Sequence, residues 1–319
     1  MNVFVTGGSG FIGSHVCQKL SEKHKVITLI RDMPPRQGSW RRWLDEALAQ
    51  TAIVVGDVLN ESLLRRILAD YQITTVVHCA AQAIVSTAQE DPLSTFQVNV
   101  QGTANLLEAC RAVPVQTLYV VSTDKVYGAK TEASEGDPLV STGIYETSKV
   151  CEDMIAQAYA RIYGLPIVIG RACNTYGYDL ANRIVPNTIR TCMKGESPII
   201  YQGEEAKRQY IYVKDHAEAI SFLLSKSPKL RSDFPISLRY PQIFNIGTSD
   251  ILNQTEVVTE ICKHYPNAEI SIKLRPKPLV ELDSQWVNSS RLESYGWCPM
   301  YHFADGIDET IKMFEKHGD

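Results

Sequence analysis

The sequence predicts an α/β fold, in which a doubly wound parallel sheet is joined to a smaller C-terminal lobe. The first apolar stretch of the chain runs directly into a glycine-rich turn and then into a helical pattern. Short runs rich in β-branched residues alternate with helical patterns as far as residue 172. Polar residues follow several of these runs, where the carboxyl ends of parallel strands would form a ligand site. Together these observations predict both the sheet and the edge at which it binds its ligands.

The N-terminal unit has the order of a βαβ motif. Its strand, glycine turn, helix and second strand are expected over residues 3–6, 7–13, 14–22 and 25–30. Gly7, Gly10 and Gly13 follow the spacing G-x-x-G-x-x-G. Glycines allow a tight turn and a close approach of the backbone to a ligand, and the N-terminus of the following helix attracts a pyrophosphate. We therefore expect a dinucleotide cofactor at this turn.

Further strand-like runs follow, each bounded by polar or turn residues. They lie at residues 52–55, 75–77, 116–121 and 166–169. Helical patterns separate or follow them at residues 61–71, 95–111 and 148–163. This regular alternation is typical of a parallel sheet with helices on both faces, the Rossmann arrangement.

After residue 172 the alternation breaks, which indicates a second lobe. There we expect a helix around 185–194, a strand and a helix over 210–224, a loop over 226–242 and a strand at 243–246. The tail is expected to hold a helix after residue 253, an exposed strand around 269–274 and a last helix from residue 305. We divide the chain into a cofactor-binding part, residues 1–172, and a substrate-binding lobe, residues 173–319, with residues 209–246 returning to the first part.

The composition is that of an ordinary globular protein, with 44% hydrophobic and 21% charged residues. The formal net charge of −4 argues against nucleic-acid binding, which needs a basic surface. No apolar stretch approaches the roughly 18 residues of a membrane-spanning helix, and no signal peptide is apparent, so we expect a cytoplasmic protein outside the membrane. The eight cysteines and seven histidines are scattered without ligand spacing, so we expect reduced cysteines and no metal.

The catalytic candidates lie in the middle of the chain. The apolar run 118–121 is followed by Thr123 and Asp124, which places polar side chains at the carboxyl end of a buried strand. Tyr145 and Lys149 are four residues apart within a helical pattern and therefore share one helix face. An ammonium group there would stabilise the phenolate and lower the pKa of the tyrosine, which makes the tyrosine usable as a general base.

These motifs in combination resemble the extended short-chain dehydrogenase/reductase family, the NAD-dependent epimerases and dehydratases. The resemblance rests on Gly7-x-x-Gly10-x-x-Gly13, Gly56-Asp57, Ala80-Ala81, Thr123 and Tyr145-x-x-x-Lys149. The stretches 123–128 and 171–177 are similar to the nucleotide-sugar branch of that family. The stretches 78–85 and 182–186 are most like CDP-glucose 4,6-dehydratases and related NDP-sugar 4,6-dehydratases.

The resemblance implies a dehydratase reaction on a nucleotide sugar. Tyr145 would remove the proton of the sugar 4-hydroxyl, Lys149 would assist it and hold the nicotinamide ribose, and Thr123 would hydrogen-bond the reacting oxygen. Asp124 would be the acid for the leaving C6 hydroxyl, whereas Lys125 is either the base at C5 or a salt-bridge partner that orients Asp124. A 4-epimerase or a reductase on the same scaffold is the alternative, and a non-catalytic dinucleotide-binding protein is the third, less favoured because Tyr145 and Lys149 are both present.

The same resemblance implies a cofactor site for NAD or NADP. Its residues would be Gly7, Gly10, Phe11, Ile12, Gly13, Arg31, Asp57, Val58, Ala80, Ala81, Tyr145 and Lys149. The second strand ends in an isoleucine rather than an acidic residue, and Arg31 is suited to a 2′-phosphate. We therefore favour NADP slightly, although Asp32 would serve the ribose hydroxyls of NAD.

The substrate is expected to be a nucleotide-diphosphate sugar, with a CDP or UDP group favoured. Its residues would be Gln82, Asn174, Arg183, Val185, Arg208 and Gln285. Relatives pair through helices that correspond to residues 102–112 and 145–163, so we expect a homodimer.

Overall fold

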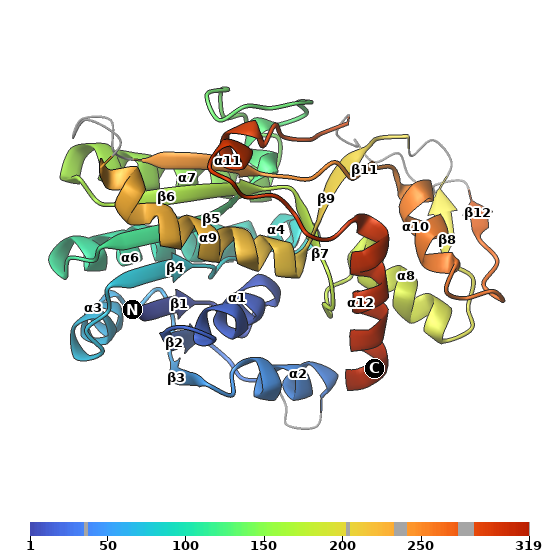
Figure 1. The fold of residues 1–319 in the computed structure, drawn as a ribbon, viewed down its shortest axis with the longest axis horizontal. Coiled ribbons are helices and arrows are strands. Elements are labelled where there is room, and N and C mark those ends of the chain that lie inside the picture. The colour runs from blue at the N-terminus through green and yellow to red at the C-terminus, as the bar shows by residue number, and fades with distance from the viewer. Residues whose placement is uncertain (35–37, 202–204, 233–240, 274–283, 319) are drawn as a thin grey trace.

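The computed structural model describes residues 1–34, 38–201, 205–232, 241–273 and 284–318. A seven-stranded parallel sheet forms its centre, in the strand order β10-β6-β5-β4-β1-β2-β3 (Figure 1). The strands are β1 Asn2–Thr6, β2 Lys25–Ile30, β3 Thr51–Val55, β4 Thr75–His78, β5 Thr117–Thr123, β6 Ile167–Ala172 and β10 Gln242–Ile246. The predicted doubly wound fold is confirmed.

The central strands are buried along almost their whole length, and mostly apolar, because helices cover both faces of the sheet. Every residue of β4 and of β6 is buried, and β1 is buried from Val3 onward. The edge strand β3 is different, since Ile53 and Val55 are exposed there. A parallel strand buried on two faces has no polar alternation, which is why these segments read as continuous apolar runs in the sequence.

Two apolar cores lie on opposite faces of this sheet. On one face pack α3 Glu61–Asp70, α6 Gly102–Ala112 and α7 Ile144–Tyr163, with buried residues such as Leu64, Leu106 and Ala156. The other face is covered by α1 Phe11–Ser21, α2 Ser39–Ala47 and α9 Val213–Ser232. The second core continues without interruption into the C-terminal half of the chain, through Ile189, Val257 and Phe314.

The C-terminal half builds two small sheets beside the large one. The first has the order β11-β9-β7 and the second pairs β12 with β8. Their strands are β7 Asn174–Tyr176, β8 Ile199–Tyr201, β9 Arg208–Tyr212, β11 Ile251–Leu252 and β12 Ser271–Lys273. The helices of this half are α8 Ile184–Met193, α10 Gln254–Cys262, α11 Ser290–Ser294 and α12 Phe303–His317. Because β10 belongs to the large sheet and β9 to a small one, the two parts of the chain interleave.

Two expectations from the sequence are wrong in detail. The helix expected over 95–111 is divided into α5 Pro92–Phe96, a π-helical turn η1 Gln97–Gln101, and α6. The loop expected over 226–242 is helical as far as Ser232, because α9 continues through Pro228; residues 233–240 lie outside the described part. The helices α2 and α4 Val85–Glu90 are not among the helices expected from the sequence.

No helix within the described ranges has both the length and the apolar character needed to cross a bilayer.

Candidate functional site

The glycine turn between β1 and α1 is shaped for a close ligand. Gly7 has a positive φ of 73°, and a Cβ at this position would lie 2.8 Å from the backbone of Ala80. A Cβ at Gly13 would lie 2.2 Å from the carbonyl oxygen of Gly7. Gly10 caps α1 without any side-chain hydrogen bond, so the first amide groups of the helix remain available to an anion. The turn therefore fits the pyrophosphate of a dinucleotide.

The end of β2 carries the residues expected at the adenosine ribose. Ile30 is fully buried, while Arg31 and Asp32 are exposed and paired, with Arg31 Nε 2.7 Å from Asp32 Oδ2. The Asp32 carboxylate raises the pKa of Arg31. Asp57 accepts a hydrogen bond of 2.9 Å from the backbone of Leu59 and so closes its own turn. A positive and a negative group thus stand together where the ribose would lie.

A cavity of about 410 Å³ opens between the carboxyl edge of the large sheet and the C-terminal lobe. It brings together a large share of the predicted site residues, namely Phe11, Ile12, Ala81, Thr123, Asp124, Lys125, Tyr145, Lys149, Asn174, Arg183 and Val185. Other predicted residues lie off its lining: Gly7, Gly10, Gly13, Arg31, Asp57, Val58, Ala80, Gln82, Arg208 and Gln285. One cavity therefore holds the end of the glycine turn, the catalytic candidates and part of the expected substrate site.

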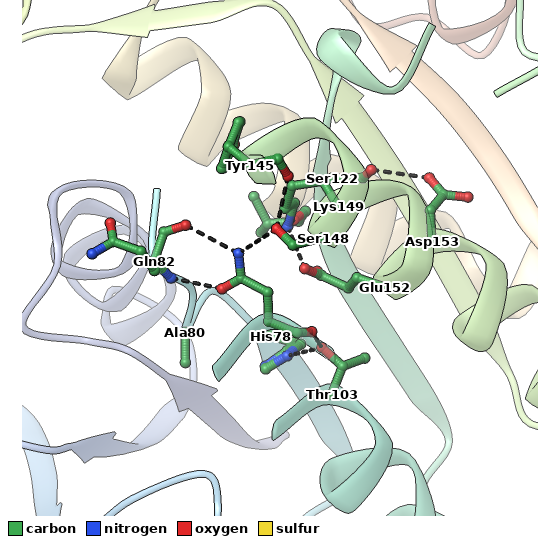
Figure 2. A network of polar contacts seen from close by, with 12 residues as sticks. His78, Ala80, Gln82, Thr103, Ser122, Tyr145, Ser148, Lys149, Glu152 and Asp153 are labelled. Atoms are coloured by element: carbon green, nitrogen blue, oxygen red, sulfur yellow. Dashed lines mark hydrogen bonds and ion pairs between the residues drawn. The ribbon is translucent and has the colours of Figure 1, made fainter. Parts of the chain in front are cut away.

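Tyr145 and Lys149 lie on adjacent turns of α7, and both face the cavity. Lys149 Nζ donates to the carbonyl oxygen of Val121 at 2.8 Å and to Glu152 Oε2 at 2.6 Å (Figure 2). The sequence led us to expect a lowered pKa for Tyr145. Instead, burial raises its pKa, the Glu152 carboxylate adds to that rise, and the Arg183 guanidinium opposes it. The spacing of Tyr145 and Lys149 predicts the opposite direction because it takes no account of burial or of the Glu152 carboxylate.

Thr123, Asp124 and Lys125 follow one another at the end of β5. Thr123 Oγ1 donates to Asp124 Oδ1 at 3.0 Å, and Asp124 is 1% exposed. Its second oxygen, Oδ2, is buried and has no hydrogen bond from the described residues. Lys125 Nζ lies 3.8 Å from Asp124 Oδ1 and donates to Asn174 Oδ1 at 3.1 Å. The site thus contains a carboxyl oxygen that no described donor satisfies, with an ammonium beside it.

Gln285 holds the backbone of this segment through hydrogen bonds. Its Nε2 donates to the backbone oxygens of Asp124 and Gly128, at 2.9 and 2.8 Å, and the residue is 1% exposed. Gln285 therefore holds the backbone of this segment, and its contact with a diphosphate stays a prediction. Arg208, its neighbour through an isolated β-bridge, lies at the start of β9.

A chain of hydrogen bonds connects α7 with the π-helical turn η1 and with the residues that follow β4 (Figure 2). Asn99, in the π-helical turn, accepts from the backbone of Gln82 and donates to Ser148 Oγ at 2.8 Å. Ser148 Oγ in turn donates to the carbonyl oxygen of Tyr145 at 2.7 Å. His78 Nε2 contacts Thr103 Oγ1 at 2.9 Å, and burial lowers the pKa of His78 to about 3. The contacts that hold α7 in place are therefore polar, and they include a histidine that burial keeps neutral.

The sequence and the structure were next compared with known proteins. Residues 3–247 match the profile of the NAD dependent epimerase/dehydratase family. The chain belongs to this family. It is 30% identical to dTDP-glucose 4,6-dehydratase of Xanthomonas campestris pv. campestris strain B100, over 97% of this chain and 92% of that protein. The fold matches the structure of UDP-glucose 4-epimerase from Thermus thermophilus in complex with NAD, with a TM-score of 0.82, 28% identity and 99% coverage of both chains.

One relative is longer than this chain, and the similarity covers only part of that relative. The trifunctional UDP-glucose 4,6-dehydratase/UDP-4-keto-6-deoxy-D-glucose 3,5-epimerase/UDP-4-keto-L-rhamnose-reductase of Arabidopsis thaliana is 26% identical over 99% of this chain. The chain spans 47% of the length of that protein. The comparisons confirm the family predicted from the motifs and its dependence on NAD.

Several polar residues in or beside the cavity were not among the site residues predicted from the sequence. Glu152 lies three positions after Lys149, a spacing that places two side chains on one helix face, so an i,i+3 search would have found the pair. His216 lines the cavity with its Nε2 unpaired among the described residues and its Nδ1 2.9 Å from Thr175 Oγ1. Neither His216 nor Asn99 stands in a recognisable motif, because their partners lie far away in the chain.

Proposed function

We propose that this protein is an NDP-sugar 4,6-dehydratase that works with bound NAD(P). The observation that carries the proposal is the Asp124 carboxyl, which is buried beside Thr123 on the cavity wall and keeps one oxygen without a described partner. Leaving such an oxygen unpaired costs free energy, so a ligand hydroxyl is the partner that it calls for. Loss of the sugar C6 hydroxyl needs an acid, and we assign that role to Asp124.

Each chemical step has a residue of this chain to perform it. Tyr145 removes the proton of the 4-hydroxyl, while Thr123 hydrogen-bonds the same oxygen. The chemistry that bound NAD(P) supplies is reversible hydride transfer, from C4 at the start and to C6 at the end. Once C4 is a ketone, the C5 proton is acidic and the C6 hydroxyl is a β leaving group. A base takes the C5 proton while Asp124 gives its proton to the departing hydroxyl, and one water is released. When hydride is returned to C6, C5 takes up a proton again, which completes the product.

Lys125 has two proposed roles that the structure supports through different contacts. Its ammonium is 3.8 Å from Asp124, as an orienting salt bridge requires. It also faces the cavity beside Asn174, as a base for the C5 proton requires. We favour the base, because Thr123 already holds Asp124 through a hydrogen bond of 3.0 Å. In Lys125→Met, a base role predicts loss of solvent exchange at C5, whereas an orienting role leaves the exchange in place.

We assign the predicted binding residues to two sites, one for the cofactor and one for the nucleotide sugar. Gly7, Gly10 and Gly13 hold the pyrophosphate of the cofactor, as their contacts allow. Arg183 lies 5.7 Å above the Phe11 ring and 3.4 Å from Asp179, at the N-terminal end of α8. A guanidinium there suits a sugar-nucleotide diphosphate, for which a CDP or UDP group remains our proposal. The slight preference for NADP also remains a proposal, and separate binding titrations with NAD and NADP test it.

The T. thermophilus relative favours a second candidate, an NDP-sugar 4-epimerase. That protein is named a UDP-glucose 4-epimerase and resembles the chain along its full length. An epimerase would use the same Tyr145 but would have no need of an acid at C6. Asp124 therefore favours the dehydratase, and its substitution distinguishes the two candidates.

The deciding experiment is mass spectrometry of the protein incubated with CDP-, UDP-, dTDP- and GDP-sugars in deuterated water. We expect one substrate to lose a water and to retain solvent deuterium at C5. In Asp124→Asn we expect reduced cofactor to accumulate while water is no longer lost, because C4 oxidation does not use Asp124. Asp137→Asn, on an outer loop, is the matched control and should behave as the unaltered protein does. An unchanged mass with a new stereoisomer would establish the epimerase instead.

We further propose a cytoplasmic homodimer. The eight cysteines are all free, and α7 carries exposed apolar side chains at Met154, Ile162 and Tyr163, which are 58%, 72% and 55% exposed. An apolar helix face of this kind is suited to pairing with a second copy. Light scattering on Met154→Glu/Ile162→Lys tests the pairing, and a monomer is the expected result.

A further inference from the structure

Glu152 is a buried carboxylate next to the catalytic pair. It is 1% exposed, and its Oε2 lies 2.6 Å from Lys149 Nζ. Both residues lie on α7, where Tyr145 occupies the preceding turn (Figure 2). Glu152 does not line the cavity. Glu152 therefore acts on the site through its contact with Lys149 and through its charge.

Structural stability does not explain this carboxylate. A buried ion pair is often no more stabilising than apolar residues of the same volume, because both charges lose their hydration. The neighbouring carboxylate, Asp153, points toward Ser122 (Figure 2). It is already paired with Arg171 in two hydrogen bonds of 2.9 Å. The packing of α7 on β6 therefore has its own ion pair, and Glu152 serves Lys149 alone among the contacts described.

We propose that Glu152 is a positioning residue that fixes the Lys149 ammonium and offsets its charge. Tyr145 then holds its proton more tightly than it would beside a lysine without a carboxylate partner. The proposal rests on the proposed role of Tyr145 as the base at the sugar 4-hydroxyl. It assigns to the helix a triad, Tyr145, Lys149 and Glu152, in place of a pair.

The charges around the triad agree with this role. The titratable groups that face Glu152 and its lysine are Lys149, Tyr145 and Asp153 on α7, with His78 and Cys79 at the end of β4. Burial is the first cause of the raised pKa of Tyr145, and Glu152 is the second. Burial also raises the pKa of Glu152 to about 7, against the opposing charge of Lys149. The carboxylate therefore acts on the phenol and itself titrates near neutrality.

A tighter proton on Tyr145 has a chemical purpose in the proposed reaction. In a dehydratase the C4 oxygen ends as a ketone, so the proton taken by Tyr145 should not return to it. In molecules whose Tyr145 is ionised, each unit by which the pKa of the phenol rises favours the protonated phenol and the ketone about tenfold over the phenolate and the alcohol. Below that pKa the ionised fraction of Tyr145 falls by the same factor, so the gain is in the commitment of the step and not in its overall rate. An epimerase must return this proton and would gain nothing from a stronger hold.

The test is the ionisation of Tyr145 in the cofactor-loaded protein, followed by NMR of ¹³C-labelled tyrosine and assigned with Tyr145→Phe. We expect Glu152→Gln, which keeps the shape and removes the charge, to lower the midpoint by about one pH unit or more. Glu152→Asp keeps the charge and should stay near the unaltered protein. Glu146→Gln, another buried carboxylate of α7 with a smaller effect on Tyr145, is the matched control and should shift the midpoint less.

The pH dependence of C4 oxidation gives a second readout. The acid limb of the rate should move to lower pH in Glu152→Gln by the same amount as the NMR midpoint. Equal midpoints in Glu152→Gln and the unaltered protein, or no ionisation in either across the stable range, overturn the proposal. If Glu152→Gln does not fold, Glu152→Asp with a midpoint unlike that of the unaltered protein overturns it as well. The NMR titration needs no sugar, so a failure of the proposed function appears separately, as full turnover in Tyr145→Phe.

Discussion

Removing the carboxylate of Asp153 should destabilise the protein through the charge that it leaves behind. Arg171 is 1% exposed and Asp153 is fully buried, and two hydrogen bonds of 2.9 Å join them. In Asp153→Asn the guanidinium stays buried without its counter-charge. Removal of one partner from a buried pair costs about 3–5 kcal/mol, and we expect the lower end because the asparagine oxygen remains as an acceptor.

The expected loss of about 3 kcal/mol can be converted into a melting temperature. Unfolding entropy is about 2.1 cal/mol/K per residue, which gives about 0.7 kcal/mol/K for a chain of this length and a fall in Tm of about 4–5 °C. Urea denaturation and calorimetry measure these quantities, with the cofactor concentration held fixed because a bound ligand stabilises the folded state. Glu260→Ala breaks an exposed pair with Lys263 and is the control, expected to cost less than about 1 kcal/mol.

A second variant separates the lost charge from lost packing. Asp153→Asn/Arg171→Met removes both charges and should recover most of the stability, because no unpaired ion is then left in the core. The residual loss should reflect the contacts of Arg171 with Tyr127 OH at 2.7 Å and with the carbonyl oxygen of Glu135 at 3.2 Å. The reasoning is refuted if the single variant loses less than about 1 kcal/mol, or if the double variant is no more stable than the single one.

Three further predictions concern the cofactor, the catalytic segment and acid. Gly13→Ala should weaken NAD(P) binding at least about tenfold in calorimetric titrations, because its Cβ would lie 2.2 Å from the Gly7 carbonyl oxygen; unchanged affinity would contradict this. Gln285→Ala should lower kcat with little change in KM in steady-state kinetics, because the backbone that carries Asp124 loses a hydrogen bond of 2.9 Å. The free energy of unfolding should fall as pH decreases from about 6.5 toward 4, since the folded pKa of His78 is about 3 and only the unfolded chain takes up the proton. Urea denaturation across this range should show the fall, and His78→Asn should make it shallower.

The sequence predicts well what depends on neighbours along the chain. The βαβ unit, the parallel strands and the placement of Thr123 and Tyr145 at one edge follow from local periodicity and turn chemistry, and the structure brings these residues to one cavity. The helical continuation of α9 to Ser232 is the opposite case. Proline and serine in that stretch favour a loop locally, yet the helix continues to Ser232.

What the sequence could not predict depends on residues that meet only after folding. The raised pKa of Tyr145 follows from burial and from Glu152, and neither can be read from the spacing of Tyr145 and Lys149. Gln285 reaches the backbone of Asp124 across 161 positions of sequence. Asn99, in the π-helical turn, likewise meets the backbone of Gln82 only in the folded chain.

The position of β10 has a consequence for synthesis of the chain. This strand closes the large sheet by pairing with β6, from Gln242↔Val168 to Ile246↔Ala172. A ribosome that has released β6 has therefore made a sheet whose outer strand still presents unpaired backbone groups. This edge stays unpaired until the intervening residues and then β10 have been translated. During this interval it can pair with a strand from another nascent chain. Expression at low temperature or with chaperones that shield strand edges should raise the yield of this protein more than stabilising its cofactor turn would.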